Sequence, residues 1–447
     1  MYGLHTDLYQ LTMAAGYFHR GLDRTVATCE LFVRSLPSAR RYLLAAGIER
    51  ALRYVTELRF DDEQLSFLRT VPALRDGMDE AFSSHLRGLR FSGDVWAVPE
   101  GTVVFESEPL LRVRAPLIEA QLLETFLLST VNHATMVASK AARMVRAAAG
   151  AELIEFGSRR THPEAAVDAA QAAYVAGFVG TSNVEAGRRS GVPVLGTAAH
   201  MWTMVHDTEE QAFEGYVRVF PNASILLIDT YDTVRGARRA ARIARERLRG
   251  VRLDSGDLLE LSRAVRGVLD AEGCPRARIV ASGDLNEYTI RDLVAAGAPI
   301  DLYGVGTELV SSPDAPSLGG VYKVVQFERD GRVVPIAKFS RGKVTYPGAH
   351  QIYRQHGAAG APTRDLLALC DEPAPAGATP LLEQRIRGGE PTGQGQTLSE
   401  ARERARAGLA DLGRSLHDLE PAEERYPVDP SPALEQLLAE VRRRQLG

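Results

Sequence analysis

Cysteine is scarce in this sequence. The 447 residues include three cysteines, Cys29, Cys274 and Cys370, and no two of them share a CxxC spacing. Such a pattern excludes a disulfide framework and a structural zinc site, and it is typical of a reducing compartment.

Long apolar runs and an excess of one charge are missing as well. No window approaches the roughly 18 uninterrupted apolar residues of a membrane helix, and the first residues, MYGLHTDLYQLTM, contain no basic segment followed by an apolar one. The net charge of −4 gives no sign of a surface that binds polyanions. We therefore expect a cytoplasmic protein with neither a membrane nor a nucleic acid as partner.

The chain is long enough for more than one core. With 447 residues, 45% of them hydrophobic, it exceeds the roughly 250 to 300 residues at which single cores stop growing. Short apolar runs between Pro and Gly turns predict a small sheet from Phe91 to Ala115, and a helical stretch follows from Pro116 to Arg146. A strand pattern returns after Thr307. We expect at least two domains.

From Glu152 onward one theme repeats: a short apolar run, a polar or glycine cluster, and an amphipathic helix. The runs are ELIEFG, GFVGTSN, VPVLGTAAH, SILLIDT, GVRLDSGD, ARIVASGD and IDLYGVGT. Helices of this kind cross over between parallel strands, so the repeat predicts an α/β fold with an irregular or incomplete (β/α) barrel. Catalytic groups of such barrels lie at the carboxyl ends of the strands.

Polar or small residues stand at these predicted strand ends. They are Arg159 and Arg160, Thr181 and Ser182, His200, Asp229, Arg252 with Asp254 and Ser255, Asp284, and Gly304 with Gly306. A barrel would bring three carboxylates, several arginines and a histidine to one mouth, which folding alone does not require. Taken singly, Asp229 or Asp254 would serve equally well as a helix cap, and His200 as a structural histidine.

The residue types at these strand ends suit a phosphorylated sugar. Asp229-Thr-Tyr-Asp232 and Asp254-Ser-Gly-Asp257 carry the short oxygen-bearing side chains that hold ribose hydroxyls and Mg²⁺. The Gly304-Val-Gly306-Thr307 segment would let backbone amides approach a phosphate, or it is a simple tight turn.

An aromatic ring and two arginines stand together in Phe156-Gly-Ser-Arg159-Arg160. The guanidinium groups match the oxygens of a carboxylate or phosphate, although surface salt bridges are an equal reading for Arg160. Phe156 belongs either to the core or to a site where it stacks on a flat ring.

Eight motifs, in this order, resemble the nicotinate phosphoribosyltransferase family and, less closely, nicotinamide phosphoribosyltransferases: TDLYQLTM, EFGSRR, GTSN, GTAAH, DTYDT, RLDSGD, SGDL and YGVGT. The resemblance spans about residues 4 to 350 and continues more weakly through the C-terminal helices. It implies an irregular (β/α) barrel plus a discontinuous α/β sandwich domain, and a homodimer whose active sites use both chains.

The resemblance implies three regions. Residues 1–115, joined by a returning segment 320–365, would form the sandwich; residues 116–319 would form the barrel with the active site; and residues 366–447 would form a mainly helical extension.

The same resemblance assigns roles to individual residues. Tyr9 would reach into the partner's site and stack on the pyridine opposite Phe156, unless it is a buried aromatic of its own helix. His200 matches the histidine that the family phosphorylates with ATP as co-substrate. Asp229, Arg252, Asp254 and Asp284, with Ser255 and Gly256, match residues around the ribose, the diphosphate and Mg²⁺. Gly304, Gly306 and Thr307 match a phosphate loop, and Lys338 a basic position near phosphates.

Mg²⁺ would be carried mainly by the diphosphate, with Asp254 or Asp284 as the candidate protein ligand. Nicotinamide enzymes carry an aspartate where GTSN has Ser182, which can donate to the carboxylate of nicotinate instead of repelling it. The predicted substrates are therefore nicotinate, 5-phosphoribosyl 1-diphosphate and ATP.

Rival readings are open to test. They are a nicotinamide phosphoribosyltransferase, a quinolinate phosphoribosyltransferase, a non-catalytic relative that binds pyridine nucleotides, and an unrelated barrel lyase. His200 and the long C-terminus disfavour the quinolinate enzyme. The complete set of His200, Asp229, Asp254 and Asp284 disfavours a non-catalytic relative, and the strand ends offer neither the Schiff-base lysine nor the metal cluster that a lyase needs.

Overall fold

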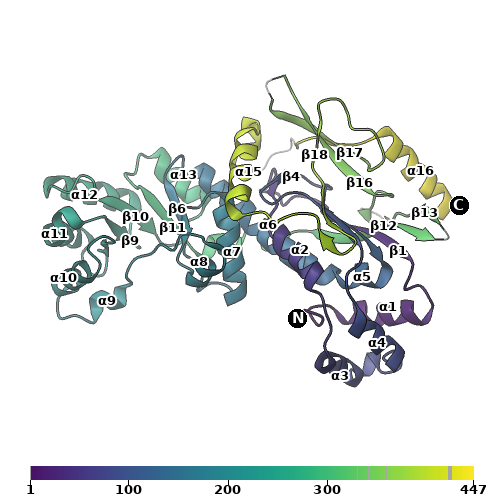
Figure 1. Cartoon of the computed structure of the whole chain (residues 1–447). Coiled ribbons are helices and arrows are strands. Elements are labelled where there is room, and N and C mark those ends of the chain that lie inside the picture. The colour runs from purple at the N-terminus through teal and green to yellow at the C-terminus, as the bar shows by residue number, and fades with distance from the viewer. Residues whose placement is uncertain (1, 330, 341–342, 359, 421–424, 447) are drawn as a thin grey trace. The chain divides into compact units, whose positions relative to one another are not determined.

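The computed structural model describes residues 2–329, 331–340, 343–358, 360–420 and 425–446. The chain forms two compact units, one made of Met1–Met136 with Ser317–Gly447 and the other of Val137–Pro316 (Figure 1). In the described part of the chain, no helix has the length and apolar character needed to cross a membrane.

The second unit contains a curled parallel sheet with the strand order β7-β6-β11-β10-β9-β8 (Figure 1). Its strands are β6 (Glu152–Glu155), β7 (Gly180–Thr181), β8 (Ile225–Leu227), β9 (Gly250–Leu253), β10 (Arg278–Ser282) and β11 (Leu302–Val305). The last strand of the series, β11, pairs with the first, β6. All six strands run in the same direction, so their carboxyl ends lie along one edge.

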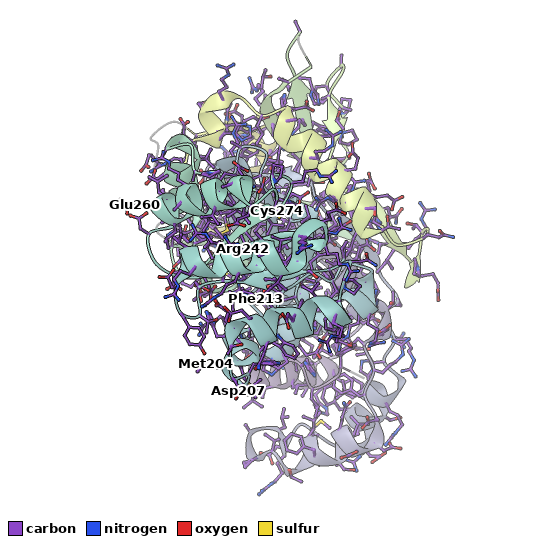
Figure 2. All side chains as sticks on the ribbon, turned by 90° about the vertical axis from the view of Figure 1, so that its left-hand side faces the viewer. Met204, Asp207, Phe213, Arg242, Glu260 and Cys274 are labelled. Atoms are coloured by element: carbon purple, nitrogen blue, oxygen red, sulfur yellow. The ribbon has the colours of Figure 1, made fainter. Side chains whose placement is uncertain are left out.

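Helices connect these strands. They are α7 (Pro163–Ala176), α8 (Val184–Ser190), α9 (His200–Met204), α10 (Glu209–Val219), α11 (Thr233–Ala244), α12 (Leu258–Ala271), α13 (Glu287–Ala295) and α14 (Thr307–Ser311). Figure 2 looks onto α10, α11 and α12, which lie side by side and carry the labelled Phe213, Arg242 and Glu260 respectively. Buried alanines of α11 and buried Val265 and Leu269 of α12 face the core, while Arg242 stays outside.

One of the seven predicted strands is wrong. The run VPVLGTAAH forms no strand and makes a single parallel bridge, between Thr181 and Val194. Val192 is buried, but Val194 and Leu195 are exposed, so the run does not bury its apolar side chains as a core strand would. The predicted irregular barrel is therefore a six-stranded half-barrel in the described residues.

The first unit is built on sheets that are antiparallel except for the parallel pairing of its strands β17 and β21. Its larger sheet has the order β13-β12-β1-β5-β3-β19-β20, and a second has the order β18-β16-β17-β21. The strands are β1 (Val26–Val33), β2 (Leu43–Leu44), β3 (Asp94–Ala97), β4 (Val103–Val104), β5 (Pro109–Pro116), β12 (Gly320–Arg329), β13 (Arg332–Pro335), β14 (Phe339–Ser340), β15 (Lys343–Val344), β16 (His350–His356), β17 (Pro362–Leu369), β18 (Thr379–Pro380), β19 (Glu383–Arg387), β20 (Glu390–Pro391) and β21 (Val428–Pro430). Strand β12, which returns after the second unit, pairs with β1.

The helices of the first unit are α1 (Leu8–His19), α2 (Ile48–Glu57), α3 (Asp62–Thr70), α4 (Glu80–Gly88), α5 (Leu117–Leu122), α15 (Leu398–Ala410) and α16 (Pro432–Leu446). The single helix expected from Pro116 to Arg146 is divided at Leu123 into α5 and α6 (Glu124–Ala147), and α6 crosses the boundary between the units.

The segment 366–447 was expected to be mainly helical. It also supplies β18, β19, β20 and β21, and two of these lie in the larger sheet of the first unit. The observed boundaries are 136/137 and 316/317. The boundaries expected from the sequence, 115/116, 319/320 and 365/366, remain predictions.

A buried acid pair stands beside the second sheet. Asp365 of β17 is fully buried and accepts hydrogen bonds from Arg354 of β16 and from the hydroxyl of Tyr426. Glu108 is also fully buried and accepts from the amide of Phe105. Burial raises the pKa of Glu108 well above its ordinary value, and the neighbouring charge of Asp365 raises it further. Both effects favour the neutral, protonated form of Glu108 over its carboxylate in the folded protein.

This proton makes stability depend on pH. The pKa of Glu108 is higher in the folded state than in the unfolded state, so the stabilisation exists below the ordinary glutamate pKa and is lost as the pH rises through the folded value. We predict that Glu108→Gln, a permanently neutral isostere, increases the free energy of unfolding by about 1–3 kcal/mol at pH 8. The gain should shrink towards pH 4.

Urea unfolding at several pH values measures this difference. Glu57→Gln, a change at an exposed glutamate of the same unit, is the control and should show no such pH dependence. A Glu108→Gln protein that is less stable than the wild type at pH 8 would show that Glu108 is charged there.

Candidate active site

The carboxylate of Asp229 connects three groups at the carboxyl edge of the half-barrel. Its side chain, just beyond β8, is 1% exposed. Oδ2 accepts from the backbone amide of Asp254 at 2.9 Å and from the hydroxyl of Ser255 at 2.7 Å. Oδ1 lies 3.3 Å from Nε2 of His200, whose side chain is 40% exposed at the start of α9. The predicted residues His200, Asp229, Asp254 and Ser255 therefore do meet.

Arg252 forms a second network next to it. Its guanidinium donates to Asp254 Oδ1 at 2.6 Å, to Ser282 Oγ at 2.8 Å and to Thr197 Oγ1 at 3.0 Å. The Ser282 hydroxyl in turn donates to Asp254 Oδ1 at 2.6 Å. Burial by itself raises the pKa of Asp254, but the hydrogen bond from Ser282 and the charge of Arg252 outweigh it and lower that pKa. Asp254 is held as a carboxylate.

The helix caps are made by other aspartates. Asp232 accepts from the amide of Arg235 at the start of α11, and Asp257 accepts from the amides of Leu259 and Glu260 at the start of α12. In both D-x-x-D motifs the second aspartate caps the helix, while the first, Asp229 or Asp254, faces the polar network. The alternative that Asp229 and Asp254 are themselves caps is wrong.

Phe156 presents an aromatic ring at the same edge. Its ring packs against the core formed by Ile154, Val280 and Leu302, and the guanidinium carbon of Arg252 lies 5.4 Å from the ring centroid. A Cβ on Gly304 would come within 2.5 Å of this ring. Position 304 thus needs a glycine because the ring of Phe156 occupies the space that a side chain would fill. From the sequence, this glycine was expected to make room for a phosphate. Phe156 is both a core residue and a side chain of the mouth.

A buried carboxyl group lies behind Phe156. Glu155, the last residue of β6, is 1% exposed, and it accepts from the hydroxyl of Thr181 at 2.5 Å and from the amide of Gly157. Thr181 is itself fully buried, and Ser182 is exposed beside it. Ser182 thus faces solvent at the strand end, whereas the Thr181 hydroxyl is occupied.

Other predicted residues of the second unit lie on exposed loops. Arg159 and Arg160 are exposed, and within the described ranges neither makes an ion pair, so the surface salt bridge considered for Arg160 is not formed. Asp284 is exposed and has φ 45°, a left-handed conformation that a non-glycine residue seldom adopts. Gly256 is exposed after Ser255, with φ 83°.

The Gly306-Thr307 segment begins a helix. Gly306 precedes the short helix α14, which starts at Thr307, and both residues are partly buried. Its proposed contact with a phosphate is a prediction that rests on this position alone.

Tyr9 and Lys338 belong to the first unit. Tyr9 lies on α1 with 49% of its surface exposed, so it is not the buried aromatic considered as the alternative. Lys338 is exposed, and its backbone amide donates to Thr345. Their roles towards the residues of the second unit stay predictions.

Family models match most of the chain. The N-terminal domain model of nicotinate phosphoribosyltransferase matches residues 4–132, and the nicotinate phosphoribosyltransferase family model matches residues 151–345. Nicotinate phosphoribosyltransferase pncB2 of Mycobacterium tuberculosis is 43% identical over 448 residues, which cover 98% of this chain and 94% of that protein. The chain belongs to the nicotinate phosphoribosyltransferase family.

The chain is also similar to other members of the nicotinate phosphoribosyltransferase family. The Bacillus subtilis enzyme is 44% identical over 383 residues, covering 83% of this chain and 76% of that enzyme. The crystal structure of human nicotinic acid phosphoribosyltransferase superposes with a TM-score of 0.86 at 31% identity, covering 98% of this chain and 99% of that one. The resemblance stated from the eight motifs is thereby confirmed.

The sequence analysis did not single out four residues that hydrogen-bond to predicted site residues: Thr197, Ser282, Glu155 and Asn183. Ser282 was the easiest to find, because it ends β10 just as Asp254 follows the end of β9. Glu155 and Asn183 stand inside recognised motifs, yet only their contacts reveal them. Nothing in the sequence pairs Thr197 with Arg252.

We expect the hydrogen bonds of Ser282 to stabilise the folded protein. We predict that Ser282→Ala lowers the free energy of unfolding by about 1–3 kcal/mol, because Arg252 and Asp254 both lose the buried Ser282 hydroxyl as a hydrogen-bond partner. Urea unfolding followed by circular dichroism measures it. The matched control is Ser262→Ala on α12, since Ser262 is equally buried but bonds only to a carbonyl of its own helix. An equal loss in both variants would contradict the special role of Ser282.

Proposed function

We propose that this protein transfers the phosphoribosyl group of 5-phosphoribosyl 1-diphosphate to nicotinate, giving nicotinate mononucleotide and diphosphate, the first step of NAD biosynthesis from nicotinate. The observation that carries the proposal is the mouth at the half-barrel edge. An aromatic ring, an arginine, two aspartates and a histidine converge there, in a chain of this family.

The pyridine ring stacks on Phe156. Ser182, exposed at the end of β7, donates a hydrogen bond to the nicotinate carboxylate, and the unpaired Arg159 and Arg160 add positive charge nearby in the chain. An aspartate in place of Ser182 would repel this carboxylate. Nicotinate is therefore preferred over nicotinamide.

The sugar diphosphate binds next to it. Ser255, Gly256 and Asp284 are exposed at neighbouring strand ends and can reach ribose hydroxyls. Gly306 and Thr307 would offer the phosphate backbone amides at the start of α14, while Gly304, beside the Phe156 ring, would serve the loop only indirectly. Lys338 would add charge.

Mg²⁺ fits this arrangement as an ion carried mainly by the diphosphate. In the described part of the chain no three His, Cys, Asp or Glu side chains form a metal cluster. The oxygen ligands still open are Oδ2 of Asp254, whose Oδ1 is taken by Arg252 and Ser282, and the exposed carboxylate of Asp284. When bound, Mg²⁺ neutralises charge on the departing diphosphate.

The reaction proceeds by displacement at C1 of the ribose. The nitrogen of nicotinate forms the new bond to C1 as the C1–O bond to diphosphate breaks, and positive charge builds on the ribose. In this proposal Asp229 and Asp254 stabilise this charge, and Arg252 stabilises the leaving group. Asp254 is suited to the task because Arg252 and Ser282 keep it ionised.

His200 is the site of ATP-dependent phosphorylation in this proposal. With Nε2 donating to Asp229, Nδ1 keeps a lone pair that can attack the γ-phosphorus of ATP and release ADP. Hydrolysis of the phosphohistidine then couples a second favourable reaction to the transfer. The sequence has no GxxxxGK[ST] loop, so ATP would use the anion sites of the sugar diphosphate.

A homodimer completes the proposal. The exposed face of α1 carries Leu8, Tyr9 and Met13. In the second unit, Met201, Met204 and Val205 are exposed in and after α9, where Met204 is labelled in Figure 2. Apolar surfaces of this kind mark protein interfaces, and Tyr9 would enter the partner's site. The cytoplasmic location also stays a prediction.

The purified protein tests the reaction directly. With 5-phosphoribosyl 1-diphosphate and Mg²⁺, we expect nicotinate mononucleotide from nicotinate and little product from nicotinamide. ATP should stimulate the wild type and not His200→Ala, because the variant has no histidine to phosphorylate. Chromatography of the mononucleotides measures the products. Product mainly from nicotinamide would overturn the role of Ser182, and no product from either would favour a binding protein.

Mixing two inactive variants tests the shared site. Tyr9→Ala and Arg252→Ala should each be nearly inactive, yet their mixture, after subunit exchange, should regain about a quarter of wild-type activity, since half of the dimers are mixed and each has one intact site. Sedimentation confirms the dimer. A dimer whose mixture stays inactive would mean that each site is built from one chain.

A further inference from the structure

Two loops at the carboxyl edge of the half-barrel are joined by one buried carboxyl group. Glu155 lies at the end of β6, directly before Phe156, and is 1% exposed. Its Oε1 accepts from the amide of Gly157, in its own loop, and its Oε2 from the hydroxyl of Thr181 at 2.5 Å, in the neighbouring loop after β7. A single side chain therefore fixes the starting points of both loops.

The hydrogen bond to Glu155 determines the direction of the Thr181 hydroxyl. That hydroxyl has one proton and gives it to Glu155, so its oxygen is left as an acceptor, which the amide of Asn183 uses at 2.9 Å. Thr181 then has no proton for a ligand. Ser182, between these two residues, is the side chain of this loop that stays exposed.

Asn183 closes the connection from the other side. Its side-chain amide nitrogen donates to the hydroxyl of Ser158 at 3.1 Å, and its side-chain oxygen caps α8 by accepting from the amide of Ala186. The backbone amide of Ser182 donates to the carbonyl of Glu155 at 2.9 Å. The loops that carry Phe156 and Ser182 are thus tied to each other at three points.

Packing alone gives no reason for a carboxyl group here. Burial raises the pKa of Glu155, and the hydrogen bonds from Thr181 and Gly157 offset this effect only in part. An apolar side chain of similar size would avoid the desolvation penalty, but it would leave both donors without an acceptor. What the carboxyl group provides is geometry, namely a fixed distance between the two loops.

We propose that Glu155 is a positioning residue for the pyridine substrate: through Thr181 and Gly157 it holds Ser182 and Phe156 at the separation at which one bonds the carboxylate and the other stacks on the ring. This inference rests on the proposed function. Glu155 itself does not touch the substrate. The groups assigned to the sugar diphosphate, on β9, β10 and β11, have no hydrogen bond to Glu155 in the described ranges.

Steady-state kinetics of Glu155→Gln tests the proposal. The glutamine keeps the shape but cannot accept from both donors at once, so the loops lose their register. We expect the KM for nicotinate to rise about tenfold, with kcat and the KM for 5-phosphoribosyl 1-diphosphate nearly unchanged. Thr181→Val should raise the KM for nicotinate in the same way, whereas Thr181→Ser, which keeps the hydroxyl, should retain the wild-type KM. The Glu155→Gln/Thr181→Val double variant should have a KM for nicotinate no higher than that of the poorer single variant.

A matched control separates positioning from general stability. Glu209 on α10 is also a buried glutamate whose pKa is raised by burial, and it pairs with Arg239 away from both loops. Glu209→Gln should leave the KM for nicotinate unchanged, whatever its effect on the melting temperature. Hydrogen exchange gives a readout without catalysis: the amides of Gly157 and Asn183 should exchange faster in Glu155→Gln than in the wild type.

The outcomes are distinct. A wild type without activity on nicotinate would overturn the proposed function, and unchanged exchange at Gly157 and Asn183 would overturn the positioning role as well. An active wild type whose Glu155→Gln variant keeps the wild-type KM for nicotinate, or loses kcat and both KM values together, would overturn the positioning role alone.

Discussion

The polar edge of the half-barrel depends on the buried carboxylate of Asp229. This group accepts from the amide of Asp254 and the hydroxyl of Ser255, and so it fixes the start of the loop after β9 against the end of β8. It also orients the imidazole of His200 from a third segment. A buried carboxylate is stable only when its oxygens are satisfied, and here each donor that satisfies it is also a part of the mouth.

A second buried carboxyl group has a similar place toward the opposite end of the strand order. Glu155 joins the loops after β6 and β7, as Asp229 joins those after β8 and β9. Between them, Arg252 and Ser282 connect β9 with β10. Each bridge runs between neighbouring parallel strands, because the strand spacing of about 4.8 Å leaves side chains at their ends within hydrogen-bond distance. Each loop of the mouth is therefore held by hydrogen bonds to the loop or strand end next to it.

The missing strand at residues 192–200 has a clear consequence. Because this run makes one bridge and leaves Val194 and Leu195 exposed, Thr197 is free of a sheet and instead accepts from Arg252. His200, three residues later, begins a helix and remains partly exposed. In a regular strand, the backbone amides and carbonyls of this segment would have been hydrogen-bonded to the neighbouring strand. The irregularity of the barrel thus lies at the segment that carries the histidine.

The sequence by itself determined the family, the parallel α/β character of residues 152–307 and most residues of the mouth. These properties are local: an apolar run followed by a polar residue marks a strand end wherever the strand lies in the sheet. It could not decide which aspartate of each D-x-x-D motif caps a helix, why position 304 needs a glycine, or that VPVLGTAAH would remain outside the sheet. Those outcomes depend on which strand becomes the neighbour of which, and hence on contacts such as Phe156 with Gly304 and Glu155 with Thr181 that join residues far apart in the chain. Only the tertiary structure sets such distances, because hydrogen bonds and ring packing act over a few ångströms in space and carry no mark in the spacing along the sequence.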